Sequence, residues 1–209
     1  MSGKAKAVTK SLRAIARKMT GRSLKSMHPD TAKEPLVTHL TASISPRLHV
    51  CQADYRNPVH ADALVRLLDA YAQDPAGGGE ALSAFAKAHL VKELAARPQA
   101  FSVLAFSGDH GDQPVGLVNC IEGFSTFACR PLVNVHDVAV LASHRGQRVG
   151  EQMLVLVEEI SRERGACKLT LEVLAGNARA IRLYQRVGFA GYQLDPAMGQ
   201  AQFFQKWLV

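Results

Sequence analysis

The chain has 209 residues, 47% of them hydrophobic, which suffices for one globular domain with a substantial core. No apolar run reaches the roughly eighteen residues of a membrane-spanning helix, so none is expected. The net charge of +7 comes entirely from residues 1–46, where nine Lys and Arg face two acids. The rest of the chain is therefore neutral, and only 6% of all residues are aromatic. Both observations argue against nucleic-acid binding by residues 47–209.

Residues 1–46 are expected to form a basic, flexible extension and linker before a domain at residues 47–209. Residues 1–29 hold eight Lys and Arg and no acid, and three prolines mark residues 28–46 as a linker. Three interpretations of the basic segment stay open: a flexible appendage, a transit-like or membrane-surface helix, and a translation start further along, for example at Met27.

From residue 47 the hydrophobic pattern predicts an α/β fold with the element order βααβββαβαββ. Apolar residues at helical spacing predict helices over residues 59–72, 82–96, 149–164 and 177–187. Apolar or alternating runs predict strands over residues 48–53, 101–106, 115–123, 132–141, 168–174, 189–194 and 201–207. Four cysteines without a CxxC pair or a His/Cys ligand spacing indicate free thiols, no metal site and a cytoplasmic location.

The segment 138–150 carries the clearest indication of a binding site. An apolar strand runs into a turn with Arg145, Gly146, Arg148 and Gly150, and a helix follows at once. The first amides of a helix lack internal partners and lie at the positive end of its dipole. Glycines let a bulky anion approach the main chain, and the arginines add charged donors. The segment therefore predicts a cradle for a diphosphate.

The glycine-containing turn at residues 145–150 also has other interpretations. A P-loop needs Gly-Lys-Ser/Thr, which is absent, and the glycine spacing does not fit a dinucleotide-binding fingerprint. An ordinary strand–helix turn with glycine remains possible for the segment taken alone.

A second segment, 177–189, adds a specific pattern. Residues 145–150 match Q/R-x-x-G-x-G/A except that Arg148 replaces the common Gly, and residues 177–189 match N-x-x-A-x-x-L-Y-x-x-x-G-F. In these motifs the chain resembles the GNAT superfamily of acetyl-CoA-dependent N-acetyltransferases over about residues 47–209. The resemblance implies a mixed, mostly antiparallel twisted sheet flanked by helices, with acetyl-CoA as co-substrate and no metal.

The resemblance also implies roles for individual residues. Main-chain groups of Gly146, Arg148 and Gly150 would hold the diphosphate, and the strand edge at Val138 and Val140 would pair with the pantetheine arm. Asn177 would bond the same arm, and Tyr184 would lie near the thioester sulfur as general acid. The implied cofactor-binding set is Val138, Val140, Arg145, Gly146, Gln147, Arg148, Val149, Gly150, Asn177 and Tyr184.

A base is expected because an alkyl ammonium, with a pKa of roughly 10.4, must lose a proton before it attacks. His136, Asp137 and Glu122 are the candidates, and a water is an alternative. The stretch 135–137 is similar to the place where spermidine/spermine acetyltransferases carry a Glu-Asp pair, with His136 at the position of the catalytic Glu. Imidazole titrates near neutrality, which makes His136 the first candidate.

The expected reaction is acetyl transfer to a primary amine of a small molecule, such as an amine, diamine or amino acid, within a ternary complex. A protein amine is the second acceptor class. A non-catalytic CoA-binding sensor is the alternative from another class, although the intact Asn177 and Tyr184 favour an enzyme. A homodimer is an expectation from the family alone.

Overall fold

The computed structural model describes residues 48–108, 110–192, 195, 197, 199 and 201–208. The expected extension and linker at residues 1–46 lie outside this part of the chain. The elements follow one another as β1 (His49–Gln52), α1 (Pro58–Ala72), α2 (Ala84–Ala95), β2 (Ala100–Ser107), β3 (Gln113–Ser125), β4 (Arg130–Val140), the 3-10 helix η1 (Ala142–His144), α3 (Val149–Glu163), β5 (Leu169–Leu171) and α4 (Ala178–Arg186).

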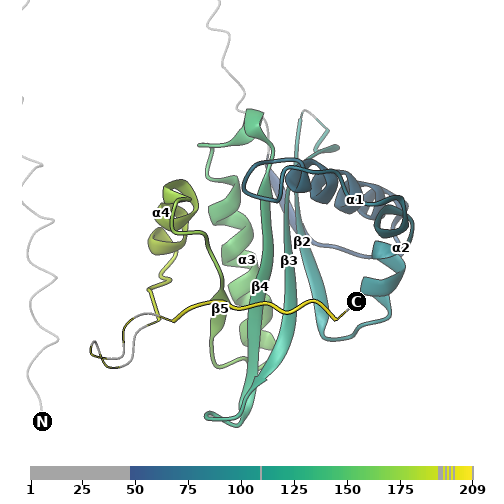
Figure 1. The fold of residues 1–209 in the computed structure, drawn as a ribbon. Coiled ribbons are helices and arrows are strands. Elements are labelled where there is room, and N and C mark those ends of the chain that lie inside the picture. The colour runs from purple at the N-terminus through teal and green to yellow at the C-terminus, as the bar shows by residue number, and fades with distance from the viewer. Residues whose placement is uncertain are drawn as a thin grey trace, which may run out of the picture. The chain divides into compact units, whose positions relative to one another are not determined.

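The strands form one sheet in the order β1-β2-β3-β4-β5 (Figure 1). The first three pairings are antiparallel, and only β5 runs parallel to its neighbour β4. A parallel pair requires a crossover, and α3 supplies it between β4 and β5. The α/β class and the mostly antiparallel sheet are thus confirmed.

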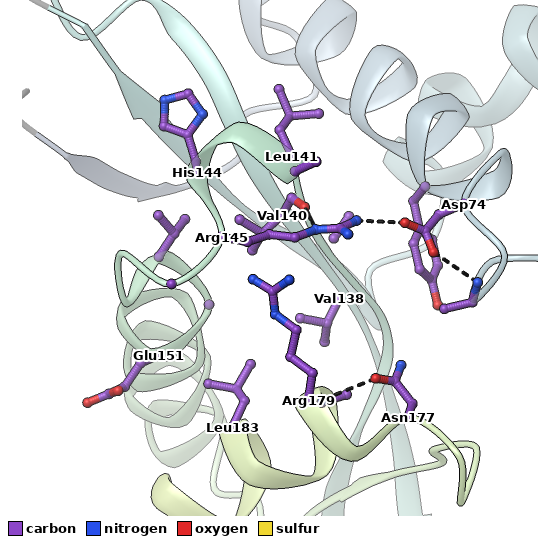
Figure 2. A pocket seen from close by; sticks show the side chains of 18 of the residues that line it. Asp74, Val138, Val140, Leu141, His144, Arg145, Glu151, Asn177, Arg179 and Leu183 are labelled. Atoms are coloured by element: carbon purple, nitrogen blue, oxygen red, sulfur yellow. Dashed lines mark hydrogen bonds and ion pairs between the residues drawn. The ribbon is translucent and has the colours of Figure 1, made fainter.

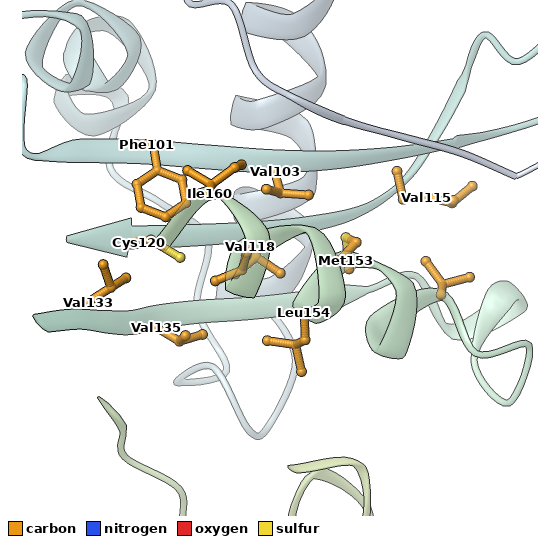
Figure 3. Packing of buried hydrophobic residues seen from close by; sticks show 13 residues of the cluster. Phe101, Val103, Val115, Val118, Cys120, Val133, Val135, Met153, Leu154 and Ile160 are labelled. Carbon is orange, nitrogen blue, oxygen red and sulfur yellow. The ribbon is translucent and has the colours of Figure 1, made fainter. Parts of the chain in front are cut away.

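Helices cover both faces of the sheet, because alternate side chains of the central strands point to opposite sides. On one face, Met153, Leu154 and Val157 of α3 pack against a valine-rich surface of β2, β3 and β4 (Figure 3). On the other face, Leu64 and Leu67 of α1 pack against residues such as Leu104 and Leu117. The sheet is therefore the shared centre of two apolar clusters.

Side-chain caps explain where three of the helices begin. The side chains of Asn57, Ser83 and Asn177 accept hydrogen bonds from amides in the first turns of α1, α2 and α4. By contrast, the residue before α3, Arg148, has a left-handed backbone conformation, with φ 60° and ψ 17°. No side chain caps the start of this helix. The start of α3 thus differs from the other three, and it lies where the sequence predicts an anion site.

The two strands predicted at residues 189–194 and 201–207 are not found among the described residues, and this part of the prediction is wrong. Phe189 instead closes α4, because its amide donates to the Tyr184 carbonyl at 2.9 Å and its ring packs edge-on against the Tyr184 ring. Phe203 and Trp207 are 75% and 78% exposed. An alternating apolar pattern makes a strand only where a neighbouring strand pairs with it.

Candidate active site

A cleft of about 920 Å³ opens where β4 ends (Figure 2). The cleft lies against four parts of the chain: the end of β4, the loop that leads into α3, the helix α4 and the connection after α1. Its volume is at the upper end of the range for small-molecule sites. β5 pairs with β4 only at Val133–Val135, so among the described residues no strand lies beside this edge of β4 from Val138 onward.

The loop before α3 is shaped for close approach of an anion. Gly146 and Arg148 both have positive φ, at 84° and 60°, and a Cβ at Gly146 would meet nothing within 4 Å. The first amides of α3 are not capped by a side chain. They remain available to a ligand at the positive end of the helix dipole. The left-handed backbone at Arg148 also explains why glycine suits this position.

Arg145 does not extend freely into the cleft. Its Nε donates to the Val140 carbonyl at 2.9 Å, and its Nη2 donates to Asp74 Oδ2 at 2.7 Å. This hydrogen bond, with one from the Ala76 amide, holds the pKa of Asp74 below its usual value, and the charge of Arg179 acts in the same direction. The ion pair therefore ties the loop after α1 to the loop before α3.

Three further arginines line the cleft and were missed by the sequence reasoning. They lie on α4, where Arg179 extends toward Arg145 (Figure 2). Their spacing of three and four residues on a helix was a usable signal, because such residues share one helix face. The side chains in question are Arg179, Arg182 and Arg186.

Most of the residues implied for cofactor binding lie together in this cleft. Val138, Val140, Val149, Gly150, Asn177 and Tyr184 join the loop residues among those that line it. Gln147 is outside the lining, and its side-chain amide donates to the Ser143 carbonyl at 3.1 Å. Asn177 Oδ1 accepts from the Ala180 amide at 3.1 Å as the cap of α4, which leaves its Nδ2 for a ligand.

Tyr184 and Tyr71 lie in the lining of the same cleft. Burial raises the pKa of Tyr184 to about 12, with a smaller contribution from Tyr71. Burial also raises the pKa of Tyr71, and the negative charge of Asp137 raises it further. Both phenols therefore remain protonated hydrogen-bond donors throughout the physiological range.

The three candidate bases have different surroundings. Asp137 is half-buried and accepts a hydrogen bond from Asn119 Nδ2 at 2.9 Å. His136 is exposed at an irregularity of β4, because Asn119 pairs with Asp137 and Cys120 pairs with Val135, which leaves His136 without an opposite residue. Neither His136 nor Asp137 is among the lining residues of the cleft.

Glu122 is held in a different environment. Its carboxylate accepts from Arg164 Nη1 at 3.3 Å, and the two side chains are about equally buried. The Arg164 guanidinium also lies over the Phe101 ring, 4.7 Å from its centre. The negative charge of Glu122 is therefore balanced by a cation already packed against the core.

The described residues contain neither a metal-ligand cluster nor a disulfide. Among the described residues, no three His, Cys, Asp or Glu side chains gather as they would around a metal ion. Cys51, Cys120, Cys129 and Cys167 are free thiols. Within the described ranges, no helix is both long and apolar enough to cross a bilayer.

Comparisons with known proteins cover the part of the chain that forms this cleft. Residues 59–189 match the model of the acetyltransferase (GNAT) family. Streptothricin acetyltransferase of Streptomyces lavendulae is 37% identical over 89 residues, which cover 41% of this chain and 47% of the relative. The match thus spans less than half of the length of this curated relative.

Solved structures share the fold. A probable acetyltransferase superposes with a TM-score of 0.65 at 19% identity, covering 76% of this chain and 98% of the other. The aminoglycoside N-acetyltransferase AAC(6')-Iy, solved in complex with CoA, superposes with a TM-score of 0.58 at 14% identity, covering 77% of this chain and 95% of the other.

Proposed function

The chain belongs to the acetyltransferase (GNAT) family, and we propose that it transfers the acetyl group of acetyl-CoA to a primary amine of a small molecule, by direct attack in a complex that holds both. The observation that carries this proposal is the uncapped start of α3, which opens into a cleft lined by arginines and by Tyr184. Acetyl-CoA, when bound, supplies the activated thioester carbonyl that the amine attacks.

The residues present fit the two chemically distinct parts of CoA. The amides at the start of α3 suit the diphosphate, and the open space at Gly146 lets it approach the main chain. Arg145, Arg148 and Arg179 would supply countercharge. The edge of β4 at Val138, which β5 does not reach, suits the amides of the pantetheine arm, to which Asn177 Nδ2 would also donate.

Tyr184 would act as a hydrogen-bond donor to the departing sulfur. A phenol with a pKa of about 12 transfers its proton to a thiolate of pKa roughly 8.5 only against about 5 kcal/mol. Hydrogen bonding to the developing negative charge needs no such transfer and is stronger than bonding to a neutral group. We therefore assign Tyr184 the stabilisation of the thiolate rather than its full protonation.

Asp137 is the candidate base that its surroundings favour. Its carboxylate is oriented by Asn119 and lies close enough to Tyr71, a residue of the cleft, to raise the pKa of that phenol. It would take one proton of the ammonium directly or through one water, after which the nitrogen lone pair attacks the carbonyl carbon. The carbon–sulfur bond then breaks, and the second proton lost by the nitrogen passes through solvent to the released thiolate. His136, the first candidate from the sequence, remains the alternative.

The test is turnover with a panel of amines. The panel holds streptothricin and an aminoglycoside, for which the relatives are named, together with a diamine, a polyamine, amino acids and a peptide with a free N-terminus. Cys129 is exposed and would react with a thiol reagent, so released CoA is measured by chromatography and the acetylated product by mass spectrometry.

The outcomes separate the acceptor classes. Equal amounts of CoA and a singly acetylated small amine support the proposal, and an N-acetylated form of the same amine serves as the unreactive control. Acetylation of the peptide alone would assign a protein amine as the acceptor. Binding of acetyl-CoA without transfer to any amine would identify a sensor and contradict the proposal.

A further inference from the structure

A row of polar side chains crosses the sheet on the face covered by α1. Ser102 of β2 pairs with Asn119 of β3, and Asn119 pairs with Asp137 of β4, so the three side chains are direct neighbours on adjacent strands. The hydroxyl of Tyr55, in the connection after β1, forms a hydrogen bond with the hydroxyl of Ser102. Ser102 is 0% and Asn119 is 5% exposed, so the middle of the row is enclosed.

The hydrogen bonds of this row run in one direction. The Asn119 amide must turn its Nδ2 toward Asp137, at 2.9 Å, because a carboxylate only accepts. Its Oδ1 then accepts from Ser102 Oγ at 2.6 Å. Since this uses the single proton of the Ser102 hydroxyl, Tyr55 must be the donor in its 2.9 Å contact with Ser102. Every donor therefore points toward Asp137.

Stability of the fold alone does not explain why these buried side chains are polar. The same face of the sheet continues with Leu104, Leu117 and Ala139, which pack against α1. Apolar residues could fill a buried site at least as stably as polar ones, whose hydrogen bonds mainly offset the cost of removing them from water. A row that is polar throughout and ends on a half-buried carboxylate fixes the position of that carboxylate.

We infer that Tyr55, Ser102 and Asn119 are positioning residues that hold Asp137 in one orientation, with Oδ2 bound by Asn119 and Oδ1 directed to the ammonium group of the acceptor. This inference rests on the proposed function of Asp137 as the base. An amide cannot readily accept and release a proton, so the proton taken by Asp137 does not travel along the row. The row orients the carboxylate and does not conduct protons.

Single substitutions along the row test the inference. Ser102→Ala leaves the Asn119 carbonyl without its donor and is expected to lower kcat for the amine roughly tenfold, with the KM for acetyl-CoA unchanged. Ser102→Thr keeps the hydroxyl and should restore most of the rate. Tyr55→Phe, at the far end, should have a smaller effect. Ser107→Ala is the matched control, since Ser107 is also buried on β2 but lies outside the row.

A double substitution separates positioning from loss of stability. Asp137→Asn removes the proposed base, and in this background Ser102→Ala should have no further effect on kcat. Independent, multiplying effects of the two substitutions would overturn the inference, and so would a Ser102→Thr variant as slow as Ser102→Ala. If Asp137→Asn alone kept the full rate, the proposed role of Asp137 would fail instead.

Crystal structures give a readout that does not depend on turnover. The side chain of Asp137 is expected in one orientation in the unmodified protein and in the Ser107→Ala control. In Ser102→Ala it should be spread over several orientations, because the amide of Asn119 then lacks the hydroxyl that holds it. In Tyr55→Phe, where Ser102 still donates to Asn119, the spread should be smaller. A single, unchanged orientation of Asp137 in both row variants would overturn the inference even if no amine substrate were found.

Discussion

At the scale of single residues, the phenol of Tyr184 tests how the leaving sulfur is stabilised. Tyr184→Phe removes a hydrogen bond to a developing charge, which is worth about 1.5–3 kcal/mol, so kcat should fall roughly 10- to 100-fold. The KM for acetyl-CoA should change less than about threefold. Tyr192→Phe is the matched control, because Tyr192 is an exposed tyrosine. Unchanged turnover in steady-state assays of Tyr184→Phe would remove Tyr184 from the mechanism.

The raised pKa of Tyr184 makes a second, independent prediction about pH. A raised pKa extends the protonated, donating form to higher pH, and that form is lost only as pH rises through about 12. The kcat profile from pH 7 to about 10 should therefore show no falling limb caused by this phenol. A falling limb in this range that disappears in Tyr184→Phe would show that the phenol ionises much earlier than its burial implies.

The residues of the site differ in how far the sequence could predict them. Asn177, Tyr184 and the loop around Gly146 belong to short motifs whose chemistry is local, and the structure places them in one cleft. Asp74 could not be predicted, because it joins Arg145 across 71 positions of sequence. Asn119 could not be predicted either, since its contact with Asp137 depends on the strand register.

At the scale of elements, the close approach of α3 to β3 positions the loop before α3. A Cβ at Gly116 would lie 2.8 Å from Met153 Cε and 3.1 Å from Val149 Cγ1, at the start of α3. Gly116→Val should therefore lower the free energy of unfolding by about 1–3 kcal/mol and weaken acetyl-CoA binding. Gly123→Val on the same strand is the control, because a Cβ there makes only an ordinary 3.5 Å contact. Denaturant unfolding that shows equal stability for both variants would contradict this packing.

The ion pair of Asp74 with Arg145, between the loop after α1 and the loop before α3, gives another prediction. Asp74→Asn removes a negative charge next to the expected diphosphate and releases Arg145, so acetyl-CoA should bind about fivefold more tightly by titration calorimetry. Asp69→Asn is the control, since Asp69 is also an ion-paired aspartate of this region, bound to Lys87, but does not line the cleft. Weaker binding by Asp74→Asn alone would show that the ion pair supports the site instead of competing for Arg145.

The elements themselves were predictable where their signals are local. Asn57, Ser83 and Asn177 cap three of the helices, and the long strands β3 and β4 are rich in apolar residues. β5 is shorter than predicted because it pairs with β4 over only three residues. The segment 201–207 has a strand-like pattern, but its formation depends on a partner strand that the pattern cannot specify.

At the scale of the whole molecule, the distribution of charge agrees with a small-molecule enzyme. The net charge of +7 arises within residues 1–46, and the rest of the chain is balanced. Within the described residues, arginines gather at the cleft, where they line the start of α3 and one side of α4. Positive charge is thus available where the proposed phosphates would bind, while residues 47–209 carry no net charge.

The most direct measurement is thermal unfolding of the purified full chain with acetyl-CoA, CoA or NAD at equal concentrations. A ligand at 100 times its Kd stabilises the folded state by about 2.7 kcal/mol, which raises the Tm of a chain of this size by about 5–10 °C. We predict a shift of this size with acetyl-CoA and with CoA, and none with NAD. No shift with either CoA form, or an equal shift with NAD, would contradict the assignment of the cleft to acetyl-CoA.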